Sequence, residues 1–276
     1  MADSIANRIA RLKEGKLTKS QRKLLEYFET ADAKKILYMS ITELAEEVDM
    51  AEATVLRFCR SLGFSGYQEF KFNLAQGVVN IGYRDSEGIE YVADIAETYE
   101  RAMENCRKNL SQAVLQKASD MILGARTVSC YGAGNSHLAA LELHSRLMRM
   151  GLLSYCESDA HFQNVLISSR NESDLLVLFS VSGGTKDVIE AAEIARASGM
   201  KILVITCYDK SPLARYADLV LSSAPMESPR EPGAMSSKVM QLFMVDVLCT
   251  GLHRADKTRF DHFVAKSSIA TSGKLV

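Results

Sequence analysis

The chain has 276 residues, 47% of them hydrophobic, and a formal net charge of -1 at pH 7. This length and apolar content are enough for a full core and for two domains. The near-zero charge gives no support for a protein that binds polyanions over its whole surface, so any nucleic acid must meet a local basic patch.

Cysteine usage and the N-terminal residues indicate the compartment. The six cysteines include no C-x-x-C pair and most have apolar neighbours, which favours buried, reduced thiols over a zinc site. We therefore expect neither a metal nor a cofactor. The first residues lack the apolar core of a signal peptide, and the apolar runs are far shorter than the roughly 20 residues of a membrane helix. These features predict a soluble, cytoplasmic protein without membrane contact.

The chain from Thr18 to about Val79 has helical periodicity and no convincing strand. Ser40 to Glu43 form a capping box, which predicts the start of a short helix. A three-residue turn, Asp49 to Ala51, separates this helix from a second one over Glu52 to Leu62, which Gly63 is well placed to end in a left-handed conformation. Two short helices joined in this way predict a helix-turn-helix.

A change in composition predicts a domain boundary. Between Gly77 and Gly88, glycine, asparagine and charged residues interrupt the helical pattern, which returns from Gly88 to Ala118. We therefore predict three regions. They are a helix-turn-helix domain over residues 1–78, a linker with a leading helix over residues 79–108, and a second domain over residues 109–276.

After Gly124, strand-like runs alternate with helical stretches. The predicted strands are Val128 to Tyr131, Leu152 to Tyr155, Leu175 to Val181, Lys201 to Cys207 and Leu219 to Ser222. The predicted helices include Ser136 to Met150, Thr185 to Ser198 and Ser236 to His253. Such alternation predicts an α/β fold with a five-stranded parallel sheet and helices on both faces, in three layers. Ligands of such sheets lie at the carboxyl ends of the strands.

Two polar loops, Gly132 to Ser136 and Ser180 to Thr185, each follow a predicted strand and precede a helix. Glycine lets backbone amides approach an anion, hydroxyls add donors, and a helix N-terminus adds partial positive charge. Neither loop has the Gly-Lys-Ser/Thr of a nucleotidase or the third glycine of a dinucleotide fingerprint, which favours a small phosphorylated metabolite. For either loop alone, ordinary turn chemistry is an equally good explanation. The predicted ligand residues are Gly134, Asn135, Ser136, Ser180, Ser182, Gly183, Gly184 and Thr185.

The second half of the chain resembles the sugar isomerase (SIS) domain, whose G-x-G-x-S and S-x-S-G-x-T motifs match these two loops. A later Ser-Pro-Leu-Ala and an aspartate match within Ser211 to Asp218. The first half resembles the DNA-binding domain of RpiR-type bacterial transcriptional regulators, above all in Ala53 to Phe64 and Gly66 to Lys71. The two resemblances span nearly the whole chain. They imply a regulator that reads operator DNA with its N-terminal domain and senses a sugar phosphate with its C-terminal domain.

The resemblance also implies that the Glu52 to Leu62 helix enters the major groove, where its first residues approach base edges and its arginines reach bases or phosphates. A plain solvated helix face is the alternative for the arginines. Residues 1–80 carry twelve Lys and Arg against eleven Asp and Glu, so affinity must come from the uneven placement of the cations. Ala51 stands where family members often carry serine, a cap whose replacement by alanine typically costs about 1 kcal/mol. The predicted DNA-binding residues are Ala53, Thr54, Arg57, Arg60 and Lys71.

Two histidines leave the choice between a sensor and an enzyme open. An isomerase needs a general base, and both His137 and His161 lie just beyond predicted strands. A packing or hydrogen-bonding role is the more common one for a lone histidine on a helix, so we predict no catalytic residue. Asp159 and His161 are instead expected to contact sugar hydroxyls, and Ser236 to close the pocket. A sugar-phosphate isomerase or lyase stays the alternative function, and a helical protein-interaction module the alternative for the N-terminal region.

The resemblance finally implies self-association, because SIS domains usually associate through their helices. The apolar helices over Leu138 to Met150 and Val239 to Leu252 are the surface expected for a homodimer or homotetramer. Ligand binding would then shift the spacing of the two DNA-binding helices, which requires that the ligand bind the two states with different affinity.

Overall fold

The computed structural model describes residues 5–31, 36, 39–78, 90–223 and 235–272. The chain divides into two compact units, residues 1–100 with 225–234 and residues 101–224 with 235–276. Helix α7 (Glu90–Asn109) crosses the boundary between these units. The predicted linker at residues 79–89 lies outside the described residues, so the three predicted regions stay predictions.

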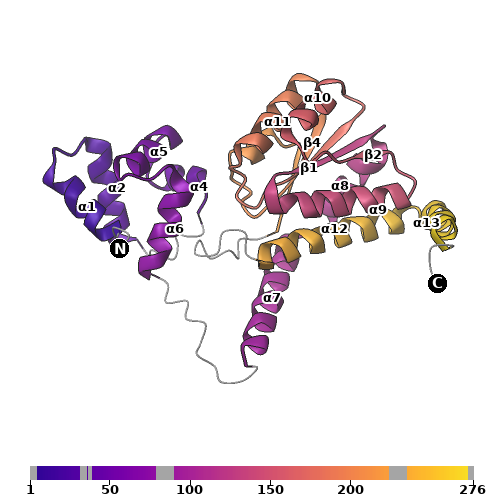
Figure 1. Cartoon of the computed structure of the whole chain (residues 1–276), viewed down its shortest axis with the longest axis horizontal. Coiled ribbons are helices and arrows are strands. Elements are labelled where there is room, and N and C mark those ends of the chain that lie inside the picture. Colours follow the sequence, from indigo (N-terminus) through magenta and orange to yellow (C-terminus); the bar gives the residue numbers. More distant parts are fainter. Residues whose placement is uncertain (1–4, 32–35, 37–38, 79–89, 224–234, 273–276) are drawn as a thin grey trace. The chain divides into compact units, whose positions relative to one another are not determined.

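The first unit is built from helices in its described residues (Figure 1). They are α1 (Ile5–Glu14), α2 (Lys19–Thr30), α4 (Ile41–Glu47), α5 (Glu52–Ser61) and α6 (Tyr67–Val78). Capping boxes start α2, where Thr18 pairs with Gln21, and α4, where Ser40 pairs with Glu43, as predicted for α4. Buried side chains from α2, α4, α5 and α6 form one apolar core. The α4 and α5 helices confirm the predicted helix-turn-helix.

Helix α1, for which the sequence analysis gave no prediction, holds the C-terminal end of α5. Its apolar side chains pack against the helical core. Arg8 Nη1 donates hydrogen bonds to the carbonyl oxygens of Leu62 (3.1 Å) and Gly63 (3.0 Å). The Arg8 guanidinium also lies 4.5 Å from the centre of the Phe64 ring. Gly63 has a φ of +81°, which confirms its predicted left-handed conformation. The position of α5 therefore depends on a contact that spans more than fifty residues of sequence.

The second unit contains the predicted five-stranded parallel sheet, in the order β2-β1-β3-β4-β5. The strands are β1 (Val128–Gly132), β2 (Ser154–Tyr155), β3 (Leu175–Phe179), β4 (Lys201–Thr206) and β5 (Leu219–Ser222). β1 and β3 are buried along their whole length, as expected for strands covered on both faces. β2 has two residues, fewer than predicted, and lies at the edge of the sheet.

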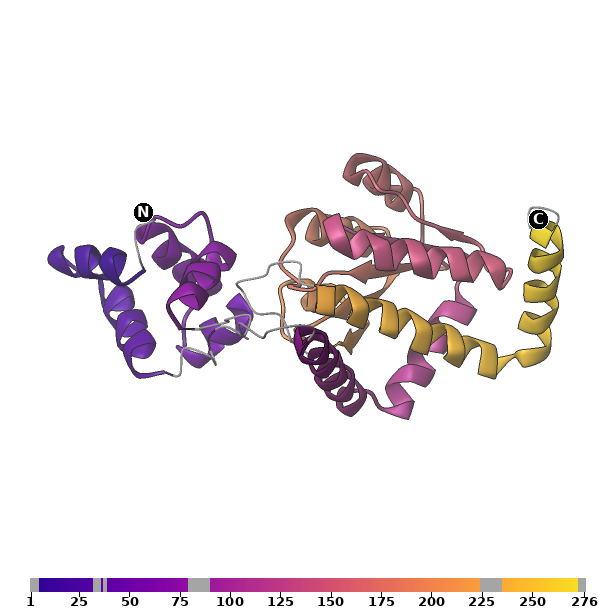
Figure 2. The same cartoon turned by 60° about the horizontal axis from the view of Figure 1, so that its bottom comes forward.

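Helices cover both faces of this sheet (Figures 1 and 2). One layer contains α10 (Ala160–Ser168) and α11 (Lys186–Ala197), which pack against each other. The other contains α8 (Gln112–Gly124), α9 (His137–Arg149) and α12 (Met235–Ala255), with α12 in contact with both of its neighbours. The three-layer prediction is thereby confirmed. α13 (Lys257–Ser272), which the sequence analysis did not single out, follows α12.

A buried carboxylate joins β1 to β3 at the amino edge of the sheet. Asp174 is 1% exposed and accepts hydrogen bonds from Arg126 Nη2 (2.6 Å), Thr127 Oγ1 (2.7 Å) and the Asn171 amide (3.1 Å). Burial alone would raise the pKa of Asp174, but these hydrogen bonds and the Arg126 charge outweigh it and lower the pKa to about 2. The ionised carboxylate is therefore a structural group of the second unit.

We expect the Asp174→Asn variant to unfold with a free energy about 2 kcal/mol smaller than that of the unmodified chain at pH 7. Because the folded-state pKa lies below the unfolded value, this contribution is complete above about pH 4 and is lost as the pH falls toward 2. Urea denaturation at several pH values measures both effects. Asp120→Asn, on the exposed side of α8, is the control, and a difference that stays constant down to pH 2 would contradict the assignment.

Candidate effector site and DNA-binding helix

The two predicted ligand loops lie side by side at the carboxyl edge of the sheet. β1 and β3 are direct neighbours, with Gly132 in register with Phe179. The chain leaves β1 toward α9 on one face and leaves β3 toward α11 on the other, so the loops flank the point where the strand order reverses. Parallel α/β sheets bind their ligands in the crevice at such a switch point. The topology therefore brings together residues that are nearly 50 positions apart.

The first loop is a tight turn that only glycine permits at its start. A Cβ at Gly132 would lie 2.8 Å from the Ser136 carbonyl carbon and 3.0 Å from the Phe179 carbonyl oxygen. The backbone then forms a short 3-10 helix, η1 (Gly134–Ser136), that continues into α9. Gly134 and Asn135 are exposed, whereas Ser136 is 8% exposed and its Oγ accepts a hydrogen bond from Gln241 Nε2 (3.1 Å). A hydroxyl that accepts one hydrogen bond still has its own hydrogen to donate.

The second loop is held closed by its own serines. Ser180 Oγ accepts from the Gly183 amide (3.1 Å), and Ser182 Oγ accepts from the Gly184 amide (3.2 Å). The two glycine amides predicted to bind the anion are thus occupied within the loop. Gly183 has a φ of +59°, and a Cβ there would lie 2.1 Å from Ser211 Oγ, so the Ser-Pro-Leu-Ala segment packs directly on this loop. Each serine hydroxyl keeps a hydrogen that can reach a ligand.

The start of α11 adds donors that the sequence analysis did not name. Thr185 is the N-cap residue of α11, and its side chain makes no cap hydrogen bond. The amides of the first helical turn, residues 186–188, therefore face the loop without a side-chain acceptor. Thr185 Oγ1 lies 3.5 Å from Ser180 Oγ, which places both hydroxyls on the same side of the loop. Free amides at a helix N-terminus favour an anion.

Carboxylates lie near the end of β1 at this edge of the sheet. Burial raises the pKa of the Tyr131 hydroxyl at the end of β1, and the nearby charges of Asp187, Asp159 and Glu190 raise it further. Asp159 is the N-cap of α10, where its Oδ1 accepts from the Phe162 amide (3.0 Å). Only the Oδ1 atom of Asp159 takes part in this cap. Tyr131 and Asp187 are residues that the sequence analysis missed, since nothing in the two motifs distinguishes them from ordinary strand and helix residues.

The other predicted ligand residues have clear places in the structure. His161 lies on α10, is exposed, and contacts only the neighbouring Phe162 ring among the interactions described. Ser236 lies in the first turn of α12 and is 8% exposed. His137 begins α9, with its Nδ1 4.0 Å from Cys156 Sγ. None of these contacts joins a histidine to a carboxylate that would orient it as a general base.

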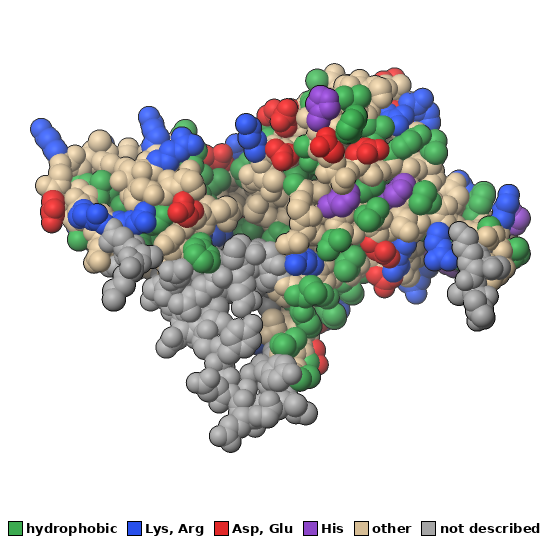
Figure 3. Space-filling view, viewed as in Figure 1, with side chains coloured by type: hydrophobic (Ala, Val, Ile, Leu, Met, Phe, Trp, Pro, Cys, Tyr) green, Lys and Arg blue, Asp and Glu red, His purple; other side chains and the backbone are tan. Residues whose placement is uncertain are grey.

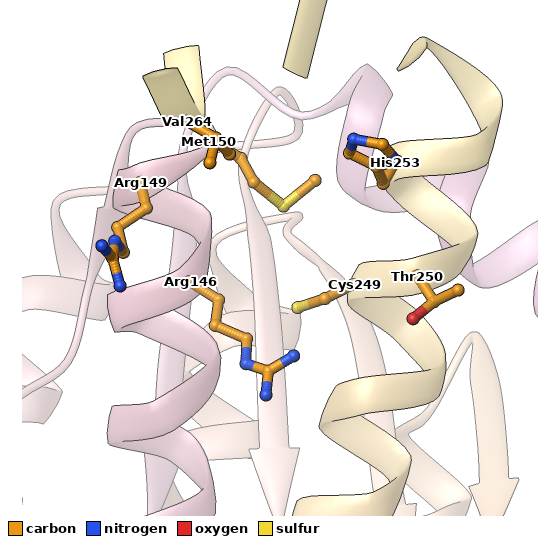
Figure 4. A pocket seen from close by; sticks show the side chains of 7 residues that line it. All are labelled: Arg146, Arg149, Met150, Cys249, Thr250, His253 and Val264. Atoms are coloured by element: carbon orange, nitrogen blue, oxygen red, sulfur yellow. The ribbon is translucent and has the colours of Figure 1, made fainter. Parts of the chain in front are cut away.

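A pocket of about 380 Å³ lies at the opposite, amino edge of the sheet, between α9, α12 and α13 (Figure 4). Its lining residues are Arg146, Arg149, Met150, Cys249, Thr250, His253 and Val264. The charge of Arg146 is neutralised by ion pairs with Glu142 (2.7 Å) and Asp246 (2.6 Å). No predicted ligand residue lines this pocket. The pocket and the two predicted ligand loops are therefore separate features at opposite edges of the sheet.

Helix α5 presents the predicted DNA-contact residues. Ala53, Arg57 and Arg60 are exposed and Thr54 is half-buried, with Arg57 Nη2 3.4 Å from Thr54 Oγ1. The opposite face is core, as predicted: Val55, Phe58, Cys59 and Leu62 are all at most 4% exposed. Burial raises the pKa of the Cys59 thiol to about 12, so this thiol is an inert core group. Arg57 and Arg60 therefore lie one turn apart on the outer face of the helix.

The start of α5 has no side-chain cap. Ala51 is the N-cap residue and makes no cap hydrogen bond, which confirms the loss expected from the serine-to-alanine difference. Asp49, in the turn, has a φ of +49°. Glu52 in the first turn accepts a hydrogen bond from the Thr42 hydroxyl of α4 and adds negative charge at the positive end of the helix. This bond fixes the two helices of the motif to each other.

The structure contradicts the prediction that Lys71 contacts DNA. Lys71 is 3% exposed, and its Nζ donates to the Met39 carbonyl oxygen (2.9 Å) and lies 5.5 Å from the centre of the Tyr67 ring. A buried ammonium must be compensated inside the protein, and this one joins α6 to the segment before α4. Exposed cations on α2 are better placed to meet phosphates. They are Lys19, Arg22 and Lys23.

The cysteines, the side chains that could bind a metal and the helices give three further observations. All six cysteines are free, and five of them are buried, as predicted. Within the described ranges, no group of three or more His, Cys, Asp or Glu side chains is placed to hold a metal ion. No helix in the described part of the chain combines the length and the apolar composition needed to cross a membrane.

Comparison with known proteins matches two family models to separate parts of the chain. The helix-turn-helix domain of the rpiR family matches residues 4–80, and the SIS domain matches residues 121–251. An uncharacterized HTH-type transcriptional regulator of Clostridium perfringens is 32% identical over 94% of this chain and 95% of its own length. The HTH-type transcriptional regulator HexR of Pseudomonas aeruginosa is 32% identical over 86% of this chain and 85% of its own length.

Among solved structures, the Vibrio vulnificus NanR protein complexed with ManNAc-6P is similar over 99% of both chains, with a TM-score of 0.86 and 26% identity. That similarity extends over the helix-turn-helix motif, the sheet and both loops described above. The chain thus belongs to the rpiR family of helix-turn-helix transcriptional regulators that carry a SIS domain.

Proposed function

We propose that this chain is a transcriptional regulator whose binding to operator DNA is modulated by a phosphorylated sugar held in its SIS domain. One observation carries the proposal. The same chain has an outward-facing pair of arginines on α5 and two hydroxyl-bearing loops at the switch point of a parallel sheet. An HTH helix with exposed arginines reads DNA, and the loops supply hydroxyls, amides and a helix N-terminus for a phosphate.

The chemistry of the loops and of their surroundings supports a sugar phosphate over a bare anion. Ser136, Ser180, Ser182 and Thr185 supply neutral donors for the phosphate, while Asp159 offers an acceptor for sugar hydroxyls. NanR, the similar solved structure, was complexed with ManNAc-6P, which favours an amino-sugar or hexose phosphate. Pentose, hexose, amino-sugar and muramyl-sugar phosphates all present the same phosphate to these loops.

We propose further that the chain holds its ligand without converting it. His161 is exposed and Asp159 is engaged in capping α10, so neither forms a histidine–carboxylate pair within the described residues. Incubation of the purified chain with each sugar phosphate, followed by chromatography of the products, tests this. Turnover that is lost in His161→Ala or His137→Ala would establish the alternative, a sugar-phosphate isomerase or lyase.

We propose that the chain forms a homodimer or homotetramer, as an operator with two-fold symmetry requires. Most apolar residues of α12 are buried within the chain, which leaves α9 as the better surface. Leu138, Leu141 and Met148 lie on one side of α9 and are 54%, 45% and 53% exposed. Figure 3 shows hydrophobic side chains on this side of the unit. Mass photometry of Leu141→Glu should show a shift toward monomers if α9 forms the interface.

The whole proposal is tested by fluorescence anisotropy with labelled DNA from upstream of the chain's own gene. We expect saturable binding, and we expect one of a panel of sugar phosphates to change its midpoint. A thermal-shift screen of the same panel finds the ligand independently, because ligand binding to the native state raises the apparent stability. Absence of DNA binding would favour the protein-interaction module instead.

A further inference from the structure

We propose that α12 forms a third wall of the effector site, in which Gln241 positions the Ser136 hydroxyl and Ser237 contacts the ligand directly. This inference rests on the proposed function and goes beyond the two loop motifs. Neither residue belongs to those motifs, and both are far from the loops in sequence.

The direction of α12 places its first turns over the carboxyl edge. Helix α9 starts at this edge, directly after the first loop, and runs toward the amino edge. α12 runs beside α9 in the same direction, since Gln241 bonds to Ser136 at the start of α9 and Asp246 pairs with Arg146 near its end (2.6 Å). Figure 4 shows the two helices side by side farther along, where Cys249 and His253 line a pocket with Arg149. Residues before Gln241 therefore extend beyond the sheet, over the loops.

Gln241 fixes the direction in which Ser136 donates. Its Nε2 donates to Ser136 Oγ over 3.1 Å, and the two residues are 1% and 8% exposed. A serine hydroxyl that accepts from an amide cannot donate back to the same nitrogen, so its hydrogen must point elsewhere. The exposed residues of this turn are Gly134 and Asn135, at the carboxyl edge of the sheet. Gln241 therefore presents the Ser136 hydroxyl to an anion as a donor before the anion arrives.

Ser237 is the independent observation that points to a ligand. It is 2% exposed, and within the described residues its Oγ has no hydrogen-bond partner. Buried hydroxyls are almost always hydrogen-bonded, because an unsatisfied one costs about 1–3 kcal/mol. Ser237 lies one turn, about 5.4 Å, before Gln241 and on the same side of α12. Its free hydroxyl is thus next to the turn that carries Ser136, where a bound ligand would satisfy it.

Two substitutions at Gln241 separate positioning from packing. Gln241→Glu keeps the shape, but its carboxylate accepts from Ser136, turns the hydroxyl hydrogen away from the crevice and adds a negative charge. Gln241→Met removes the donor to Ser136 but introduces no acceptor that would turn the Ser136 hydroxyl around. We expect the dissociation constants for ManNAc-6P and for inorganic phosphate to rise about tenfold to hundredfold in Gln241→Glu and less in Gln241→Met. If Gln241 only packed against its neighbours, the dissociation constants of Gln241→Glu would not exceed those of Gln241→Met.

Ser237→Ala should raise the dissociation constant for ManNAc-6P about threefold to tenfold, as expected for the loss of one neutral hydrogen bond. Ser119→Ala is the matched control, since Ser119 is equally buried but faces Gly251 near the other end of α12. Isothermal titration calorimetry measures the constants. Because the unpartnered hydroxyl destabilises the ligand-free chain, the melting temperature of ligand-free Ser237→Ala should be no lower than that of the unmodified chain. The DNA affinity of both ligand-free variants should be unchanged.

The outcomes distinguish this inference from the proposed function. If the unmodified chain binds neither ManNAc-6P nor inorganic phosphate, nor any other sugar phosphate tested, the proposed function falls and the α12 wall falls with it. If the unmodified chain binds, and Gln241→Glu and Ser237→Ala bind as tightly as Ser119→Ala, only the role of α12 is overturned.

Discussion

Replacing both Arg57 and Arg60 with alanine should weaken operator binding roughly a hundredfold or more, because each arginine contributes about 1–3 kcal/mol as a base contact or releases counterions as a phosphate contact. Both side chains are exposed on the outer face of α5, and the inner face of that helix is fully used by the core. Their removal should therefore leave the fold intact. Fluorescence anisotropy at several salt concentrations measures the loss.

The single variants separate the two kinds of contact. An arginine that reads a base should, when removed, relax discrimination between the operator and a scrambled sequence. An arginine that meets a phosphate should instead weaken both sequences alike and reduce the slope of log affinity against log salt by about one. The double variant Lys257→Ala with Lys266→Ala removes the same charge from exposed positions on α13 and serves as the control. If the arginine variants bound the operator as tightly as the unmodified chain, the exposed face of α5 would be a solvated surface without a role in DNA binding.

Local sequence patterns were enough to predict the helix ends and the strands, because neighbouring residues determine these features. The capping box at Ser40 and the left-handed Gly63 define the ends of the helix-turn-helix, and both lie where predicted. The sheet followed from apolar runs separated by helical stretches, because only buried parallel strands are apolar on both faces. The missing cap of α5 also followed directly from Ala51.

Features set by distant contacts were not predictable in this way. Lys71 stands between Phe70 and Phe72 on α6, and its buried ammonium is compensated by the Met39 carbonyl 32 residues earlier. Arg8 reaches the end of α5 across more than fifty residues. Neither partner can be identified from local periodicity, because a lysine or arginine is expected at the surface unless a specific acceptor is present.

The candidate site likewise has some parts that the sequence predicted and others that depend on distant contacts. The two loops of this site were predictable because glycines and hydroxyl side chains directly after a strand are a local sequence pattern typical of anion-binding turns. The Gln241 bond to Ser136 spans 105 positions, and Ser237 has the sequence signature of an ordinary residue at a helix start. Ser211 is buried against Gly183, and its Oγ accepts a hydrogen bond from the Ala214 amide (3.3 Å) in a 3-10 turn, η2 (Leu213–Tyr216). Tight packing between loops decides these positions, and single-sequence patterns do not report it.

Ser182→Ala and Thr185→Val should each shift the sugar-phosphate response to higher ligand concentration while the ligand-free chain binds DNA as before. Hydrogen bonds to a charged group contribute about 1.5–3 kcal/mol, so each loss should weaken the ligand about tenfold to a hundredfold. Both side chains are partly exposed and lie in the second unit, whereas the DNA-contact residues lie in the first. Neither change removes a core contact, so the DNA affinity should not move. Ser182→Ala also removes the acceptor of the Gly184 amide within the loop, so the melting temperature of each ligand-free variant is measured as well. Thermal shift with ManNAc-6P and anisotropy with the same ligand read the two properties separately.

Ser198→Ala is the matched control, because Ser198 is the C-cap residue at the opposite end of α11 from Thr185. Linkage makes the test more demanding, since a ligand that changes DNA affinity by some factor must have its own affinity changed by DNA by the same factor. In the unmodified chain, the dissociation constant for the sugar phosphate should therefore differ between the free and the operator-bound protein by that factor. In Ser182→Ala and Thr185→Val the DNA midpoint should respond only at ligand concentrations about tenfold to a hundredfold higher than in the unmodified chain. A response that survives both substitutions would place the phosphate outside the β3 loop, and the switch would then need a different input.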